Sequence, residues 1–273
     1  MATKFSKLSA TKEKIVILGG NGFIGNSLYN HLNSQYNTIK IGHKTENALD
    51  IIKSFEPTTI INCSASRPDA TFKESLEANL MYQTDFLNSI ILEGKPVLKW
   101  IQVGSYFEIQ IKNGRNDNYS VHKNIFRAIL DDAYNKNLIN LTTIILPHVF
   151  GPGENPNRII STLTRELKEG RAVSVSSGEQ YLPILHISDA ITALEKAIKT
   201  EQVLCYASPV WNGRLYELVE LIQCSIGKGI VNFDKSNKSI DADFPKVDFY
   251  PSVSNWKPKM DLSKILEKVK NTQ

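Results

Sequence analysis

The chain has 273 residues, with 41% hydrophobic residues, 22% charged residues and a net charge of +4. This length allows one large α/β domain with or without a small second lobe. The charge is mild and follows no basic stripe interleaved with aromatics, which argues against a nucleic-acid partner. No apolar run reaches the length of a membrane span. Three scattered cysteines lack metal-ligand spacing and are typical of a reducing compartment. We therefore expect a cytoplasmic protein without a metal or a membrane partner.

The first half of the chain alternates short apolar runs with amphipathic segments. Residues 1–13 precede this pattern, are basic and polar, and lack the features of a secretory signal, so we expect a short disordered leader. Strands are predicted over 14–20, 38–42, 58–65, 98–105 and 141–147, and helices over 26–35, 72–92 and 119–135. This alternation indicates a Rossmann domain over residues 14–147, built on a doubly wound parallel sheet with right-handed crossovers.

The pattern changes after Pro147. Residues 148–157 are rich in Gly, Pro and Asn, which predicts a long loop. Further helices are predicted over 158–170, 187–199, 214–227 and 260–270, and a strand over 172–177. We expect residues 148–273 to form a smaller, interwoven substrate-binding lobe, with some segments returning to the Rossmann core.

A glycine loop joins the first predicted strand to the first predicted helix. Gly19, Gly22 and Gly25 are spaced G-x-x-G-x-x-G, with Phe23 and Ile24 at the helix start. Glycines in this position allow a tight turn and let backbone N–H groups approach a pyrophosphate at the helix N-terminus. A glycine-rich turn without function is the alternative. The order of strand, loop and helix favours a dinucleotide site.

The residues after the second predicted strand indicate which dinucleotide binds. NAD sites usually place a carboxylate there for the ribose hydroxyls. This chain has His43 and Lys44 instead, with no acid before Glu46. A basic pair attracts the 2′-phosphate of NADP, so we expect NADP(H) rather than NAD(H). Lys44 on a solvated loop is the alternative.

The pattern Tyr-x-x-x-Lys occurs twice, at Tyr36 and Lys40 and at Tyr119 and Lys123. Four positions make one helical turn, so the two side chains of such a pair share a face. A phenol beside an ammonium can serve as a proton donor. The pattern alone does not separate this role from two ordinary residues on a solvated helix. Only the second copy follows a strand that ends in a serine, Ser105.

Motifs along nearly the whole chain resemble those of the extended short-chain dehydrogenases/reductases, the nucleotide-sugar epimerase, dehydratase and reductase family. The motifs that carry the resemblance are "GGNGFIG", "LDI", "INCSAS", "EANL", "VGSYFE", "YSVHK", "PHVFGPGE", "ILHISDA" and "NWKPKMDL". By this resemblance, the catalytic residues are Ser105, Tyr119 and Lys123.

The resemblance also implies binding residues. Beyond the glycine loop, the cofactor would contact His43, Lys44, Asp50, Ile51, Ser64, Ala65, Asn79, Tyr119, Lys123 and Pro147. The substrate would contact Ser105, Tyr119, His148 and Arg158. For four of these a structural role is the alternative: a strand-end cap for Ser105, a helix-surface residue for Asn79, a satisfied core histidine for His148 and a solvated helix start for Arg158.

The spacing from Ser105 to Tyr119 is short for epimerases and dehydratases. It resembles that of the 4-ketoreductases that make deoxyhexoses, such as paratose and abequose synthases. The resemblance therefore implies NADPH-dependent reduction of a nucleotide-linked keto sugar, in deoxysugar biosynthesis for surface polysaccharides such as the O-antigen of lipopolysaccharide. His148 stands where many members have asparagine, and "YLPILH" lacks an arginine common in that segment. Both departures affect which sugar the protein binds and not the reaction that it catalyses.

Two other functions stay open. One is a nucleotide-sugar epimerase that recycles its own NAD, which the missing carboxylate after the second strand argues against. The other is a cofactor-binding redox sensor without catalysis, which need not keep Ser105, Tyr119 and Lys123 together. The family also implies a homodimer through the helices over 72–92 and 119–135. These helices carry enough apolar residues for one face against the core and another against a second copy of the chain. Burial of both faces in the core is the alternative.

Overall fold

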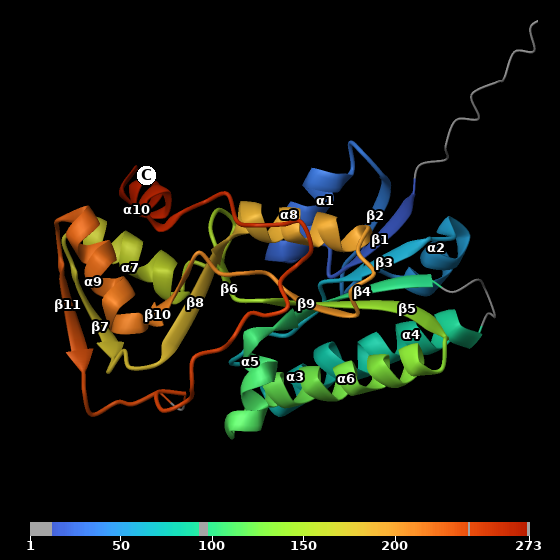
Figure 1. Cartoon of the computed structure of the whole chain (residues 1–273), viewed down its shortest axis with the longest axis horizontal. Helices are drawn as coiled ribbons and strands as arrows, with labels where there is room; N and C mark the ends of the chain where they lie inside the picture. The colour runs from blue at the N-terminus through green and yellow to red at the C-terminus, as the bar shows by residue number, and fades with distance from the viewer. Residues whose placement is uncertain (1–12, 93–97, 240, 272–273) are drawn as a thin grey trace, which may run out of the picture.

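A computed structural model of the chain describes residues 13–92, 98–239 and 241–271 (Figure 1). The expected leader lies outside these ranges apart from Glu13. No helix within the described ranges combines the length and the apolarity needed to cross a membrane.

Six parallel strands of the described chain form the central sheet, in the order β2-β1-β3-β4-β5-β9. Their bounds are β1 Lys14–Leu18, β2 Asn37–Ile41, β3 Thr59–Asn62, β4 Leu98–Ser105, β5 Ile139–Leu146 and β9 Leu204–Tyr206. The apolar residues of β1 are fully buried, as expected for a parallel strand covered on both faces. The strand order reverses between β1 and β3, and ligands bind at such a switch point in doubly wound folds.

Two helical layers cover the sheet, and alternate residues of β1 face them. Ile15 and Ile17 belong to a core with α1 (Phe23–Leu32) and α8 (Ile187–Ile198), which pack against each other. Val16 and Leu18 belong to a second core with α4 (Tyr82–Leu92) and α6 (Asn118–Asn135). The helix α3 (Phe72–Leu76) and the π-helical turn η1 (Glu77–Met81) complete this second layer, which lies below the sheet in Figure 1.

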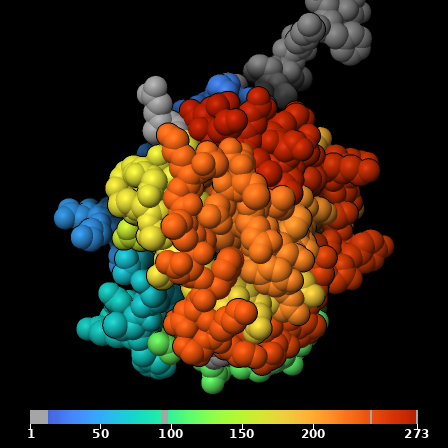
Figure 2. Space-filling view, turned by 90° about the vertical axis from the view of Figure 1, so that its left-hand side faces the viewer, coloured from blue at the N-terminus to red at the C-terminus, as the bar shows by residue number. Residues whose placement is uncertain are grey.

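The second half of the chain builds a small lobe beside the sheet. Two short sheets form it, with the orders β10-β8-β6 and β11-β7. Their strands are β6 His148–Phe150, β7 Ala172–Ser176, β8 Tyr181–His186, β10 Trp211–Arg214 and β11 Ile230–Asp234. The helices α7 (Ile159–Lys168), α9 (Leu215–Ile226) and α10 (Leu262–Asn271) pack on them around a separate apolar core. Figure 2 views the molecule from this lobe, whose surface is mostly the yellow-to-red part of the chain.

The structure differs from the sequence-based expectation at several short elements. Residues 148–150 form β6, parallel to β8, although the sequence predicts a loop there. The strands β8 to β11, the helices α2 (Ala48–Phe55) and α5 (Tyr106–Ile109) and the 3₁₀ turn η2 (Gln110–Asn113) also have no predicted counterpart. These elements are short, so periodicity is a weak signal, and contacts distant in sequence decide their conformation.

Candidate active site

The glycine loop is held against the end of β3. Gly19 has a φ of +71°, and a Cβ there would lie 2.7 Å from the backbone nitrogen of Ser64. A Cβ on Gly25 would lie 2.3 Å from the carbonyl oxygen of Gly19. Gly22 is the N-cap of α1 and provides no side-chain cap, so the first-turn N–H groups, those of Phe23, Ile24 and Gly25, face outward without a capping side chain. This geometry fits a pyrophosphate on the helix N-terminus.

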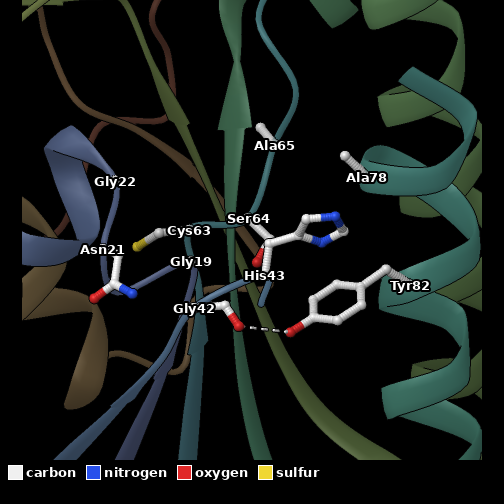
Figure 3. Close-up of a pocket in the computed structure, with 10 residues that line it drawn as sticks. All are labelled: Gly19, Asn21, Gly22, Gly42, His43, Cys63, Ser64, Ala65, Ala78 and Tyr82. Carbon is white, nitrogen blue, oxygen red and sulfur yellow. Dashed lines mark hydrogen bonds between the residues drawn. The ribbon is translucent and has the colours of Figure 1, made fainter. Parts of the chain in front are cut away.

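A cavity of about 290 Å³ opens beside this loop at the switch point of the sheet (Figure 3). The ends of β1, β2 and β3 supply one part of its lining, and η1 and α4 supply the other. The lining residues are Gly19, Asn21, Gly22, Gly42, His43, Cys63, Ser64, Ala65, Ala78 and Tyr82. Because Gly19, Asn21 and Gly22 of the loop are themselves lining residues, the loop and the cavity form one groove.

Two aromatic rings form the wall of this cavity that follows β2. The Tyr82 hydroxyl donates a hydrogen bond to the carbonyl oxygen of Gly42 at 3.4 Å, and the His43 ring lies edge-on to Tyr82 at 5.3 Å between ring centroids (Figure 3). Burial raises the pKa of Tyr82. Lys44, next in the chain, is exposed, as are Asp50 and Ile51 in α2. Tyr82 is not among the residues that the sequence motifs mark.

A buried amide network fixes the end of β3, where Ser64 and Ala65 line the cavity. Asn62 donates hydrogen bonds to Gln83 at 2.7 Å and to Gln102 at 2.9 Å. Gln83 in turn donates to the carbonyl oxygen of Ser64 at 2.9 Å. Sequence reasoning missed Gln83 and Gln102 because no local motif marks two glutamines on different elements. Burial raises the pKa of Cys63, within the same segment, to about 12.

Asn79 lies in the π-helical turn between α3 and α4 and is fully buried. Its side chain accepts a hydrogen bond from the Ser66 backbone N–H at 2.9 Å and donates to the Ser75 hydroxyl at 3.0 Å. The geometry therefore matches a bridging role rather than a helix-surface position. His122 joins the same group through its Nδ1, 2.9 Å from the Ser75 oxygen.

The predicted catalytic residues come from the end of β4 and the start of α6. Lys123 is buried and donates from Nζ to the carbonyl oxygen of Val103 in β4 at 2.9 Å. Its Nζ also lies 5.7 Å from the ring centroid of Tyr119, one turn earlier in α6. Ser105 is the last residue of β4 and caps α5, because its Oγ accepts the Phe107 N–H at 3.2 Å. That oxygen keeps its own hydrogen for donation to a substrate.

The other Tyr-x-x-x-Lys sequence does not form a pair. Tyr36 precedes β2 and Lys40 lies within it, so the two residues do not share a helical turn. Lys40 instead donates a hydrogen bond to Asn26 at 2.9 Å and lies over the ring of Tyr29. Tertiary structure thus separates two sequences that look alike.

A buried carboxylate, Glu108, lies directly behind Ser105. It accepts the Ser105 N–H at 3.1 Å and lies 3.4 Å from the guanidinium of Arg127 in α6. Burial raises the pKa of Glu108, and this effect exceeds that of the positive charges of Lys123 and Arg127, which lower it. Glu108 is not among the predicted site residues, although Ser-x-x-Glu after a strand is a capping-box signature.

His148, Glu154 and Arg158 form a cluster where the small lobe begins. Arg158 lies 2.8 Å from Nδ1 of His148 and 3.0 Å from the Glu154 carboxylate. Glu154 also lies 3.4 Å from Nε2 of His148 and accepts the Ser161 hydroxyl at 2.8 Å. Burial lowers the pKa of His148. Both ring nitrogens of His148 thus face protein groups, and Arg158, whose side chain is 36% exposed, is the member of the cluster that faces outward. Pro147 is buried just before it.

The fold agrees with comparisons to known proteins. Residues 15–205 match the NAD dependent epimerase/dehydratase family, which is most of the chain. The chain belongs to this family. The sequence-based prediction of an extended short-chain dehydrogenase/reductase with a doubly wound parallel sheet is therefore confirmed.

Individual relatives are distant. The CDP-abequose synthase of Yersinia pseudotuberculosis is 25% identical over 209 residues, which are 66% of this chain and 71% of that protein. The structure of RMD from Pseudomonas aeruginosa complexed with NADPH has a TM-score of 0.77 at 14% identity and covers 95% of this chain and 97% of its own. The GDP-mannoheptose C4 reductase MlghC from Campylobacter jejuni, with NADP bound, has a TM-score of 0.77 at 16% identity and covers 95% and 96%.

Proposed function

We propose that this protein reduces the 4-keto group of a nucleotide-linked 6-deoxyhexose with NADPH, in deoxysugar biosynthesis for surface polysaccharides. The observation that carries the proposal is the arrangement of Ser105, Tyr119 and Lys123. A serine at the end of β4, a half-buried phenol and a buried ammonium tied to the same strand come from β4 and α6, and β4 pairs with β3, whose end lines the glycine-rich groove. The similarity to a CDP-abequose synthase supports a nucleotide-linked sugar as the substrate.

The three residues can divide the work of carbonyl reduction. The nicotinamide would supply the hydride to the carbonyl carbon. Tyr119 would donate its hydroxyl proton to the carbonyl oxygen, and the Ser105 hydroxyl would polarise the same oxygen by hydrogen bonding. Lys123, held by the Val103 carbonyl oxygen, would bind the ribose hydroxyls of the cofactor and stabilise the phenolate left after proton transfer.

The glycine loop and the groove would hold the rest of the cofactor. At Gly19 and Gly25 a Cβ would meet backbone atoms of the chain, so only glycine allows the tight turn whose N–H groups a pyrophosphate would meet. His43 and the exposed Lys44 follow β2, and a 2′-phosphate there would meet positive charge rather than a carboxylate. The described chain supports NADP(H) over NAD(H) through these two residues. The structural neighbours named above carry NADPH or NADP.

Arg158 is the proposed contact to the diphosphate of the substrate. Its planar guanidinium suits two phosphate oxygens at once. His148 and Glu154 hold it from behind at 2.8 and 3.0 Å. We therefore propose that His148 acts on the substrate mainly by fixing Arg158.

We also propose a homodimer through the layer of α3, η1 and α6. Phe72, Met81 and Ile125 on these elements are 60%, 52% and 41% exposed. The three elements pack side by side, so their exposed apolar side chains lie on one layer of the molecule. Met81→Glu should convert the dimer to a monomer, measured by size-exclusion chromatography with light scattering. Ile230→Glu on the small lobe, where the side chain is 61% exposed, should leave the dimer intact.

The proposed reaction is tested by turnover with a panel of CDP-, GDP-, dTDP- and UDP-linked 4-keto-6-deoxyhexoses. We expect NADPH oxidation with at least one of them and one equivalent of a 4-hydroxy product. Conversion to a keto-sugar isomer without net NADPH oxidation would replace the reductase by an epimerase. Tight NADPH binding without turnover of any member of the panel would favour the sensor and reject the reductase.

A further inference from the structure

Arg115 is a buried cation near Tyr119 that the proposed reaction does not use. Its residue is 8% exposed, and it precedes α6 by three positions. A guanidinium removed from water is costly unless charges and hydrogen bonds compensate it. The contacts of Arg115 therefore show which groups compensate its burial and which parts of the fold it holds.

Arg115 makes contacts with three separate parts of the chain. Its Nε donates to the Ser120 hydroxyl at 3.0 Å and lies 2.5 Å from the Asp117 carboxylate, both at the start of α6. A terminal nitrogen donates to the Asp241 carboxylate at 2.8 Å. The guanidinium carbon lies 3.8 Å from the ring centroid of Phe107 in α5. One side chain thus links the catalytic helix, the turn after Ser105 and the C-terminal part of the chain.

Tyr119 depends on the start of α6, because it lies in the first turn of this helix. Asp117 is the N-cap and accepts the Ser120 N–H at 3.0 Å and the Ser120 hydroxyl at 2.8 Å. First turns of helices fray unless a cap holds them. Arg115 binds both members of this cap. It also stacks on Phe107, whose ring lies edge-on to Tyr119 at 6.3 Å. The phenol is therefore held through the helix cap and through a neighbouring ring.

Asp241 brings the small lobe into this arrangement. It lies between β11 and α10, and its side chain is 15% exposed. The next residue, Ala242, accepts a hydrogen bond at its carbonyl oxygen from Arg214 of β10 at 2.9 Å. Further along, Val247 and Phe249 pack in one apolar cluster with residues of α5. The segment 241–249 is thus joined to the small lobe at one end and to the catalytic region through Arg115 and α5.

We propose that Arg115 is a positioning residue for Tyr119, and that its ion pair with Asp241 couples this positioning to the segment 241–249 of the small lobe. Removal of Arg115 would leave the Asp117 cap and the Phe107 ring without their shared partner. The phenol would then sample orientations away from the carbonyl oxygen. The inference rests on the proposed function for its kinetic consequence and on the fold alone for its structural consequence.

The kinetic test compares Arg115→Met, Arg115→Lys and Asp241→Asn in NADPH oxidation with the accepted keto sugar. A misplacement of about 1 Å can cost on the order of 10²-fold in rate, so we expect Arg115→Met to lower kcat by roughly 10- to 100-fold. NADPH affinity should stay within about twofold, since Lys123, which is proposed to bind the ribose, is held by the Val103 carbonyl oxygen and not by Arg115. Arg115→Lys should restore part of kcat by pairing with one carboxylate. Asp241→Asn should lower kcat less, and should add nothing in the Arg115→Met background.

The structural test needs no substrate. Hydrogen exchange of the peptide spanning 116–123 should be faster in Arg115→Met and in Asp241→Asn than in the native protein. Arg165→Met is the matched control, because Arg165 is an exposed arginine paired with Glu166, remote from Tyr119 in sequence, and it should change neither quantity. Native exchange at the start of α6 in folded Arg115→Met, or native kcat, overturns the proposal.

The two proposals can fail separately. If no keto sugar is turned over by the native protein, the proposed function fails, and hydrogen exchange alone decides the role of Arg115. If Arg115→Met does not fold, Asp241→Asn and Ser120→Ala each remove one contact and decide by the same exchange measurement. Unchanged exchange in both variants overturns the inference.

Discussion

The replacement of Tyr119 by phenylalanine separates a role in chemistry from a role in stability. Within the described residues the Tyr119 hydroxyl makes no hydrogen bond, and the ring contacts Phe107 edge-on. The substitution removes one oxygen from a half-buried residue and keeps the ring. The free energy of unfolding should therefore change by less than about 0.5 kcal/mol. The start of α6 stays capped by Asp117.

The expected loss of turnover is much larger. A positioned proton donor contributes roughly 10²- to 10⁴-fold to the rate. This range corresponds to about 2.7 to 5.4 kcal/mol of activation free energy at 1.36 kcal/mol per decade. The predicted effect on the transition state thus exceeds the predicted effect on folding at least about fivefold.

The assay measures NADPH oxidation with an accepted 4-keto sugar, alongside NADPH affinity by fluorescence and stability by urea unfolding. Tyr36→Phe is the matched control, because Tyr36 begins the other Tyr-x-x-x-Lys sequence and packs half-buried against the α1 side of the core. We expect Tyr119→Phe to keep cofactor affinity and stability and to lose turnover, and Tyr36→Phe to keep all three. Turnover of Tyr119→Phe within about twofold of the native value would refute the assignment.

Four further predictions follow from particular contacts. Ser105→Ala removes both the α5 cap and the substrate donor, so it should lower stability by about 0.5–2 kcal/mol and turnover by roughly 10²–10³, measured by urea unfolding and kinetics. Lys44→Glu should shift preference from NADPH towards NADH in fluorescence titrations, and an unchanged affinity ratio would exclude Lys44 from the 2′-phosphate site. Burial lowers the pKa of His148, so the unfolded chain takes up a proton near pH 6.5 that the folded chain accepts only at lower pH. Stability should therefore fall as the pH decreases from about 6.5 towards the lowered pKa, and His148→Gln should flatten this slope in urea unfolding at several pH values. Burial raises the pKa of the Cys63 thiol to about 12, so only about 10⁻⁴ of this thiol is thiolate at pH 8. Cys224 is exposed, so rapid modification of the protein by a thiol reagent should vanish in Cys224→Ser and persist in Cys63→Ser.

The sequence alone determined the fold class and the central motifs. Apolar runs such as that of β1 mark buried parallel strands, because a strand covered on both faces has no polar side. The spacing of Gly19, Gly22 and Gly25 marks the cofactor loop, and a Cβ on Gly19 or Gly25 would collide with backbone atoms. Such signals are local, so a single segment of sequence contains them.

Only the tertiary structure decided which residues act together. Tyr36 with Lys40 and Tyr119 with Lys123 have the same spacing, and the fold places only the second pair on one helix beside β4. The sixth strand of the sheet, β9, lies in the sequence after the small lobe has begun. It joins the sheet because it pairs with Thr143 to Ile145 of β5.

The contacts that hold the site are also non-local. Gln83 and Gln102 meet Asn62 from two other elements, and Arg115 meets Asp241 across 126 positions of the chain. Each of these polar side chains reads as an ordinary surface residue in sequence. Their burial is favourable only because the folded chain brings a partner to each one, and no local pattern records that partner.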